Sequence, residues 1–348
     1  MVPSHSPAPH QMEDWRDRLW HCSADKAPES VRTAIRSFVP YASAVLGWRR
    51  AIFVGDSIAG QQFTQFEQWM TMSFGQPASR FHLHKASPLT ISTDRCSKWA
   101  VSPTNHTFTA CYFAAGMCSR TTGCSRAGQP LDVGGRSVSM RSCEATELFY
   151  NVNIGDVIDC MFKLDKLQPT DRIMLNTGLH HLSSRMNETI AQNVRAVPWW
   201  RCNHGQCLVW RETLPQHFPN SSTGAFEGAF MLCDPTAPKS KSPCAPIPHA
   251  ALHLDQGYNV PAEAALHDAA RAQGLKGPVQ IARTYHPLLD RHGDHGASHS
   301  GTPCVHRNGQ YRLDCTHYQR GSSALVMATC LTLKELAACP SPASSLTL

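Results

Sequence analysis

The chain contains a serine in a setting that suits nucleophilic catalysis. Ser57 stands in Gly55-Asp56-Ser57, directly after the short apolar run 51–54 and directly before a helical pattern. A hydroxyl between the end of a strand and the start of a helix is exposed, and the neighbouring backbone N–H groups can bind a developing oxyanion. Serine is also a frequent N-cap, so the local sequence leaves Ser57 as either a nucleophile or a helix cap.

A serine nucleophile needs a base, and the base needs an acceptor that orients it. In Asp314-Cys315-Thr316-His317 a carboxylate precedes an imidazole by three residues, so on a helical turn both side chains face the same way. Asp314 can then accept from one ring nitrogen of His317 and leave the other for Ser57. An isolated Asp-x-x-His is also typical of a helix cap. Together with the upstream Gly-Asp-Ser, it predicts a Ser57–His317–Asp314 triad that forms an acyl-serine intermediate.

Asn176 is a candidate donor to the oxyanion. It ends the predicted strand 172–175 and is followed by Thr177-Gly178. The carboxyl ends of parallel strands meet at one edge of an open α/β sheet, so its amide can point into the same crevice as Ser57. The alternative is an asparagine that forms a turn.

Two further groups of residues resemble metal sites. A His-rich tract and a short Cys/His segment contain these possible zinc ligands: His286, His292, His295, His299, Cys304 and His306 in the first, and Cys202, His204 and Cys207 in the second. The Gly, Ser and Asp residues around the tract favour a solvated loop, and the spacer with Gly205 favours a disulfide across a turn. We therefore predict no metal and no bound cofactor, with a zinc-dependent hydrolase as the rival interpretation.

The composition bounds the class of protein. The 348 residues are 42% hydrophobic and 17% charged, which suits a folded chain with a large core. The net charge of +6 is scattered and the longest basic run is Arg49-Arg50, so no nucleic-acid partner is predicted. No window approaches the roughly 18 apolar residues that a membrane span needs.

The cysteines indicate an oxidising compartment. Fifteen cysteines, 24 prolines and the sequons at Asn105, Asn187 and Asn220 favour disulfides and a glycoprotein of the secretory pathway. The first ten residues lack an apolar signal region, so we expect the targeting segment to be missing from this chain. The odd count leaves at least one thiol unpaired or intermolecular.

Periodicity predicts the elements that must position these residues. Strands are expected at 51–54, 148–154, 157–162, 172–175, 208–210 and 279–284, and helices at 12–20, 29–39, 184–197 and 260–273. A further helix after Ser57 has the apolar stripe Phe63, Phe66, Met70 and Phe74, with Gly75 as C-cap. The helix 29–39 should end before Pro40, and residues 76–144 should form a cysteine-stapled, loop-rich insertion.

The alternation of strands and helices predicts an α/β fold of three layers with a mostly parallel central sheet. We divide the chain into an N-terminal tail with short helices at 1–44, a catalytic domain at 45–335 with the cysteine-rich loop insertion at about 76–146, and a C-terminal tail at 336–348.

These motifs resemble a known family. The runs Trp48–Ser57, Asn176–Gly178 and Asp314–His317, together with Val209–Phe218 and Leu289–His295, look like the plant trichome-birefringence-like, or PC-esterase, family. That family belongs to the SGNH (GDSL-like) hydrolase superfamily. The blocks run in family order from about residue 48 to 318, although Ile58–Gln62, Leu179–His181 and Tyr318–Ser322 depart from the family pattern. The chain resembles a divergent member.

The resemblance implies O-acetyl transfer to, or ester cleavage on, hydroxyls of cell-wall polysaccharide. It implies an SGNH-like domain, an oxyanion glycine, for which Gly116 is the candidate and Gly134 and Gly135 compete, and a location in the Golgi lumen, on a membrane or outside the cell. The expected partners are a polysaccharide or oligosaccharide acceptor, an acetyl donor as co-substrate and a membrane-bound protein that supplies it.

Two rival functions stay open: a carbohydrate acetylesterase, and a non-catalytic carbohydrate-binding or assembly protein. The candidates for holding a sugar chain are His180-His181, Trp199-Trp200, Trp210 and Tyr318, and we favour a core position for the tryptophans.

Overall fold

The structure is a computed structural model. It describes residues 28–44, 47–81, 94–101, 106–114, 131–133, 136–138, 154, 158, 161, 167–168, 170–176, 194–195, 197–199, 207–219, 231–234, 236, 243–247, 259–275, 277–296, 303–307 and 309–339. The predicted helix 12–20 and most of the predicted helix 184–197 lie outside these residues.

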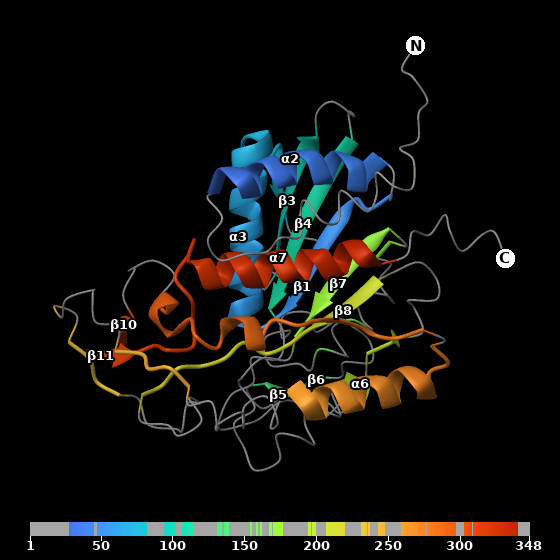
Figure 1. The fold of residues 1–348 in the computed structure, drawn as a ribbon. Helices are drawn as coiled ribbons and strands as arrows, with labels where there is room; N and C mark the ends of the chain where they lie inside the picture. The colour runs from blue at the N-terminus through green and yellow to red at the C-terminus, as the bar shows by residue number, and fades with distance from the viewer. Residues whose placement is uncertain are drawn as a thin grey trace.

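A seven-stranded sheet forms the centre of the fold, in the order β2-β3-β4-β1-β7-β8-β9 (Figure 1). Its strands are β1 Arg50–Gly55, β2 Ser79–Phe81, β3 Asp94–Val101, β4 His106–Ala114, β7 Asp171–Leu175, β8 Cys207–Arg211 and β9 Gln280–Ala282. The strands β4, β1, β7, β8 and β9 pair in parallel, and β2 and β3 form an antiparallel edge. The predicted α/β class with a mostly parallel sheet is confirmed.

Helices pack on both faces of the sheet. They are α2 Pro28–Ala44, α3 Ser57–Phe74, α6 Val260–Ala272 and α7 Ser323–Ala338. Side chains alternate along a strand, so Ala51 and Phe53 of β1 pack in one buried cluster with α2, α3 and α7, and Ile52 and Val54 pack in another with α6. A strand that is buried on both faces reads as a continuous apolar run, which is what 51–54 shows.

Several elements form where periodicity predicts them. Phe63, Phe66 and Met70 are buried along one side of α3, and Gly75 follows the helix at a φ of 81°. The strands β1, β7, β8 and β9 and the helix α6 overlap their predicted ranges.

The segment predicted as a loop-rich insertion instead supplies part of the central sheet. Thr109–Ala114 of β4 pair with the whole of β1, from Arg50 opposite Thr109 to Gly55 opposite Ala114. A disulfide between Cys96 and Cys111 joins β3 to β4. The Gly, Ser and Thr residues nearby hid the strand, although His106–Ala114 is rich in Thr and aromatic residues, which favour β structure.

Two other predictions of elements were wrong, and one helix was not predicted. Pro40 lies inside α2, which continues to Ala44 and packs Ile35, Phe38, Val39 and Ala42 into the core. Residues Ile154, Ile158 and Met161, predicted in strands, are helical and buried, as their spacing of four and three permits. Helix α7 lies at the edge of the predicted C-terminal tail and was not expected.

Two short hairpins and two 3₁₀ turns complete the described elements. The hairpins are β5 Leu131–Val133 with β6 Arg136–Val138, and β10 Cys304–Arg307 with β11 Gln310–Leu313. The 3₁₀ turns are η5 His286–Leu288 and η6 His292–Asp294. The division of the chain into a tail, a catalytic domain and a second tail stays a prediction.

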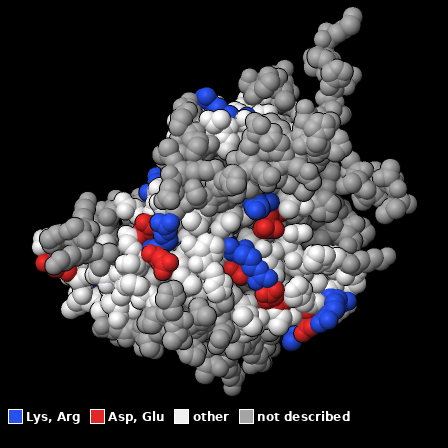
Figure 2. Space-filling view, viewed as in Figure 1, with Lys and Arg blue, Asp and Glu red and all other residues white. Residues whose placement is uncertain are grey.

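Acidic and basic side chains are mixed on the face shown in Figure 2. Among the described residues, Arg283–Glu263 and Arg271–Asp268 are ion pairs with exposed arginine side chains. None of the helices that the structure describes is long and apolar enough to cross a membrane.

Candidate active site

The turn between β1 and α3 presents Ser57. Asp56, and not Ser57, is the N-cap of α3, because its Oδ1 accepts hydrogen bonds from the backbone N–H groups of Ile58 at 3.0 Å and Ala59 at 3.2 Å. Ser57 is therefore not the helix cap, which was the alternative that the sequence left open. Gly55 has a φ of 155°, and a Cβ there would lie 2.6 Å from the backbone oxygen of Asn176, so this turn requires glycine.

The structure brings Ser57, His317 and Asp314 together. His317 Nε2 lies 2.7 Å from Ser57 Oγ, and His317 Nδ1 lies 2.7 Å from Asp314 Oδ2. This is the order of contacts that a nucleophile, a base and an orienting acceptor need. Residues 314–317 are not helical as the spacing had indicated. Instead, Asp314 Oδ1 accepts from the backbone N–H groups of Thr316 and His317, both at 3.1 Å, and this turn brings the carboxylate beside the ring.

The Asp314 carboxylate is held in its ionised form. Burial by itself raises the pKa of this carboxyl, but the hydrogen bond and charge of His317 and the two backbone N–H groups outweigh it and lower the pKa to about 2. A carboxylate next to Nδ1 fixes the ring tautomer and stabilises the imidazolium that forms when the ring takes a proton.

The amide of Asn176 is committed to other partners. The residue is fully buried, and its Nδ2 donates to the Arg211 backbone oxygen at 2.9 Å and to Thr213 Oγ1 at 3.2 Å. Those two acceptors use both amide hydrogens, so this arrangement does not support the predicted oxyanion role, and Asn176 ties the end of β7 to the segment after β8. The other candidates Gly116, Gly134 and Gly135 lie outside the described residues.

Arg211 was missed as a site residue. Its side chain is 1% exposed, and Nη2 lies 3.7 Å from Oδ1 of Asp56, the residue before Ser57. Burial lowers the pKa of the guanidinium to about 10 against the opposing charge of Asp56. The signal in the sequence is an arginine that ends the apolar run of β8, because a charge so placed is expected to have a buried partner.

The surfaces predicted to hold sugar are core residues where they are described. Trp199, Trp210 and Tyr318 are all at most 2% exposed. Trp199 Nε1 donates to the Val194 oxygen at 2.9 Å, and Tyr318 Oη donates to the Pro215 oxygen at 2.8 Å. The favoured core position of Trp199 and Trp210 is confirmed, and Tyr318 is not available for stacking on sugar. His180, His181 and Trp200 lie outside the described residues.

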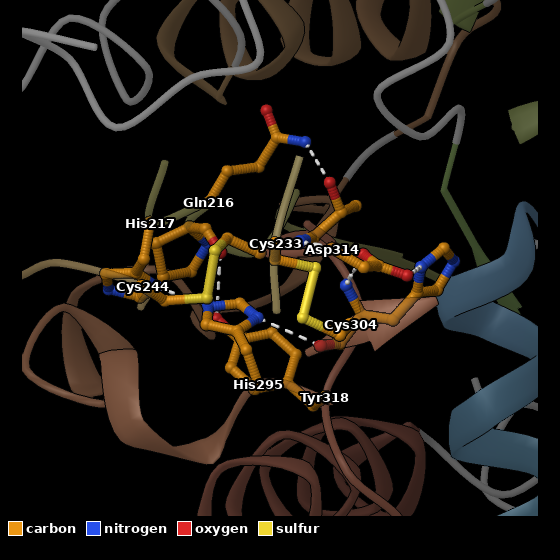
Figure 3. Close-up of a disulfide and its surroundings, with 12 residues drawn as sticks. Gln216, His217, Cys233, Cys244, His295, Cys304, Asp314 and Tyr318 are labelled. Atoms are coloured by element: carbon orange, nitrogen blue, oxygen red, sulfur yellow. Dashed lines mark hydrogen bonds and ion pairs between the residues drawn. A yellow bond between two sulfur atoms is a disulfide. The ribbon is translucent and has the colours of Figure 1, made fainter. Parts of the chain in front are cut away.

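Disulfides replace the expected cysteine arrangements. Cys207 pairs with Cys339 and not with Cys202. This disulfide joins β8 to the end of α7. Cys304 of the His-rich tract pairs with Cys233, and Cys244 pairs with Cys315 inside the Asp314–His317 turn (Figure 3). All nine cysteines in the described part of the chain are disulfide-bonded, which indicates an oxidising secretory or extracellular environment.

The His-rich tract does not form a metal cage in the described residues. No group of three or more His, Cys, Asp or Glu side chains among them is placed to hold a metal ion. His286 is exposed, whereas His295 is buried against His217, and His299 lies outside the described residues.

A scan against models of protein families finds no match, and a search of curated proteins finds none either.

Proposed function

We propose that the protein is a serine-dependent acyltransferase that moves an acyl group, in particular acetyl, to hydroxyls of cell-wall polysaccharide. The observation that carries the proposal is the contact chain from Ser57 Oγ through His317 to Asp314, with both contacts at 2.7 Å. Placement of Ser57 at the carboxyl end of β1, where sites of open α/β sheets gather, supports it further.

The chemistry follows from these contacts. His317 Nε2 takes the Ser57 proton as Oγ attacks the acyl carbonyl, and the resulting imidazolium is stabilised by Asp314. The imidazolium then gives its proton to the leaving group of the acyl donor, whose bond to the acyl carbon breaks, and an acyl-serine forms. In the second half, a sugar hydroxyl attacks the acyl-serine and His317 takes its proton, after which Ser57 regains the proton and leaves.

The N-terminus of α3 favours the charge that develops in both steps. The helix dipole at this end stabilises an oxyanion, and one well-placed donor is worth roughly 2.7–4 kcal/mol of barrier. The N–H groups of Ile58 and Ala59 already donate to Asp56 Oδ1. The backbone N–H of Ser57 is the donor that we assign from this chain, since the Asn176 amide has other partners.

The acetyl group and the polysaccharide acceptor rest on the resemblance of the motifs to the PC-esterase branch of the SGNH superfamily. The same resemblance supports our proposal of a three-layer SGNH arrangement and of a Golgi location. An esterase of the same fold shares the acyl-serine, and differs in that water and not a sugar hydroxyl resolves it. A silent carbohydrate-binding protein has no need of the three aligned side chains.

Mass spectrometry after incubation with p-nitrophenyl acetate tests the acyl-serine. We expect an adduct of about 42 Da on the Ser57 peptide and none in Ser57→Ala, because acetylation replaces one hydrogen of the nucleophile. An unmodified Ser57 in folded protein, or an adduct of equal yield in Ser57→Ala, would contradict the proposed function.

Adding xylan or other wall oligosaccharides to the acetylated protein separates transfer from hydrolysis. We expect acetylated sugar to form and release of free acetate to fall, because a bound hydroxyl competes with water for the serine ester. Acetate released at one rate with and without sugar would favour the esterase.

A further inference from the structure

Two buried histidines contact the turn Asp314–His317. His217 and His295 are 0% and 2% exposed. His295 Nδ1 lies 2.9 Å from the backbone oxygen of His317, and its ring stacks on Tyr318 with the ring centroids 4.3 Å apart (Figure 3). The backbone N–H of His217 donates to the Cys315 oxygen at 3.1 Å. Both histidines are therefore attached to the turn that carries the catalytic base.

The contacts of the two rings specify where their protons lie. His217 Nε2 faces the Leu289 oxygen at 2.8 Å, as His295 Nδ1 faces the His317 oxygen. A carbonyl oxygen accepts hydrogen bonds and does not donate them, so both of these outer nitrogens carry a proton. The inner nitrogens, His217 Nδ1 and His295 Nε2, lie 2.5 Å apart.

Two neutral rings cannot satisfy all three contacts. Each neutral imidazole carries one proton, and the outer contacts already use both, so the inner nitrogens would turn two lone pairs toward each other. One additional proton between them converts this repulsion into an N–H···N hydrogen bond. A zinc ion would instead hold two nitrogens at about 2.0–2.1 Å each in tetrahedral geometry, which places them roughly 3.3 Å apart. The inner contact of 2.5 Å suits a shared proton.

We propose that His217 and His295 share one proton across their facing nitrogens and act as a positioning pair that holds the backbone of His317, and thereby its ring, against Ser57. This positioning role rests on the proposed function of Ser57, whereas the shared proton rests on the contacts alone. When the pair loses that proton, one of the three contacts must break. The hydrogen bond from His295 Nδ1 to the His317 oxygen is one of the two outer contacts that can break.

The surroundings set the direction of the titration. Burial lowers the pKa of His217 to about 4, with His292 acting in the same direction and Asp290 and the Leu289 oxygen opposing. Burial and then His217 lower the pKa of His295 to about 3, with His317 acting in the same direction and the His317 oxygen and Asp314 opposing. Tyr318, stacked on His295, stays a neutral phenol because burial raises its pKa. The pair therefore holds the shared proton in acid and releases it as the pH rises.

Histidine-selective ¹⁵N NMR of the full-length chain reads the shared proton without any chemistry at Ser57. We expect one proton to bind jointly to the two rings as the pH falls through the lowered pKa values of about 4 and 3, with inner-nitrogen shifts between the neutral and imidazolium values, also in Ser57→Ala. His217→Asn assigns the signals and removes this joint titration, because its amide N–H donates permanently to His295 Nε2. Two rings that stay neutral throughout, or that titrate independently, would overturn the shared proton.

Acylation kinetics test the positioning role. The measured quantity is the rate at which p-nitrophenyl acetate acylates Ser57, as a function of pH. We expect the pH profile of His217→Asn to lack one ionisation, with a maximal rate within about threefold of the wild-type rate. His217→Leu, which offers no donor, should lower the rate by about 10–100-fold with KM nearly unchanged. The reason is that this variant displaces the base His317 but leaves substrate binding unaffected. Identical pH profiles in wild type and His217→Asn would refute positioning by the pair.

The two proposals fail in different ways. A shared proton in the NMR spectra together with an unacylated wild-type Ser57 would overturn the proposed function and support the pair. An acylated Ser57 together with two independently titrating rings would support the function and overturn the pair.

Discussion

Replacement of Asp56 by asparagine tests how the Ser57 turn is held. The Asp56 carboxylate caps α3 and also lies 3.7 Å from the buried Arg211 guanidinium. Asparagine keeps an oxygen for the cap but places no negative charge beside Arg211, so Asp56→Asn isolates the charge contribution. Asp56→Ala removes both the cap and the charge.

The structure sets the expected magnitude. Removal of one member of a buried ion pair costs about 3–5 kcal/mol, because an uncompensated charge stays behind. The Arg211–Asp56 contact at 3.7 Å is longer than a hydrogen bond, so we expect the lower end, about 3 kcal/mol, for Asp56→Asn. Loss of the cap adds about 1 kcal/mol in Asp56→Ala. Arg211→Met in the Asp56→Asn background should recover at least about half of the loss, since the unpaired charge is gone.

Urea unfolding of the oxidised protein, followed by far-UV circular dichroism, gives the free energy of unfolding of each variant. The matched control is Arg271→Met, because the exposed Arg271–Asp268 pair should contribute little. Wild-type stability in Asp56→Asn, or the same cost of Arg211→Met with and without Asp56, would refute the coupling of these residues.

Three further outcomes follow from the site and the disulfides. Ser57→Ala, His317→Ala and Asp314→Asn should each nearly abolish acylation in folded protein, and Ser57→Ala/His317→Ala should be hardly worse than either single variant; additive losses would contradict a triad that acts as a unit. Because the pKa of Asp314 is lowered to about 2 in the folded chain, its ionised form stabilises the fold above its unfolded value of 3.8, and this contribution of up to about 2 kcal/mol is lost as the pH falls toward 2. Urea unfolding between those two pH values should therefore show a flatter pH dependence in Asp314→Asn, and parallel curves would contradict this assignment. The disulfide between Cys207 and Cys339 closes a loop of 132 residues, so Cys207→Ser/Cys339→Ser should lower the free energy of unfolding by up to about 4–5 kcal/mol; an unchanged urea midpoint would show that this link does not restrain the unfolded chain.

The site was predictable where its geometry is local. The apolar run 51–54, the glycine and the aspartate of the turn, and the helical stripe from Phe63 to Phe74 lie within one short stretch, so their order places Ser57 at the start of a helix. The spacing of Asp314 and His317 likewise keeps them within reach of each other in most turns, which is why the pair was found although the turn is not helical.

The sheet was only partly predictable. The buried strands β1, β7 and β8 stand out as apolar runs, whereas β4 mixes threonine with aromatic residues inside a segment rich in turn-forming types. Local composition therefore concealed a strand whose place beside β1 is fixed by packing on α2 and α3. Helix α7 was missed because it is apolar on most sides, which removes the periodic pattern that identifies a surface helix.

The sequence by itself determined the residue types that can do the chemistry, the α/β class and the elements next to Ser57, because these depend on contacts between neighbours in the chain. Tertiary structure alone decided the partners that lie far apart along it: Cys339 for Cys207, Arg211 for Asp56 and His295 for His217. It also directed the Asn176 amide toward Arg211 and Thr213 and buried Tyr318. The physical reason is that a hydrogen bond, an ion pair or a disulfide is selected by the distance between two groups after the chain has packed, and periodicity holds no information on that distance.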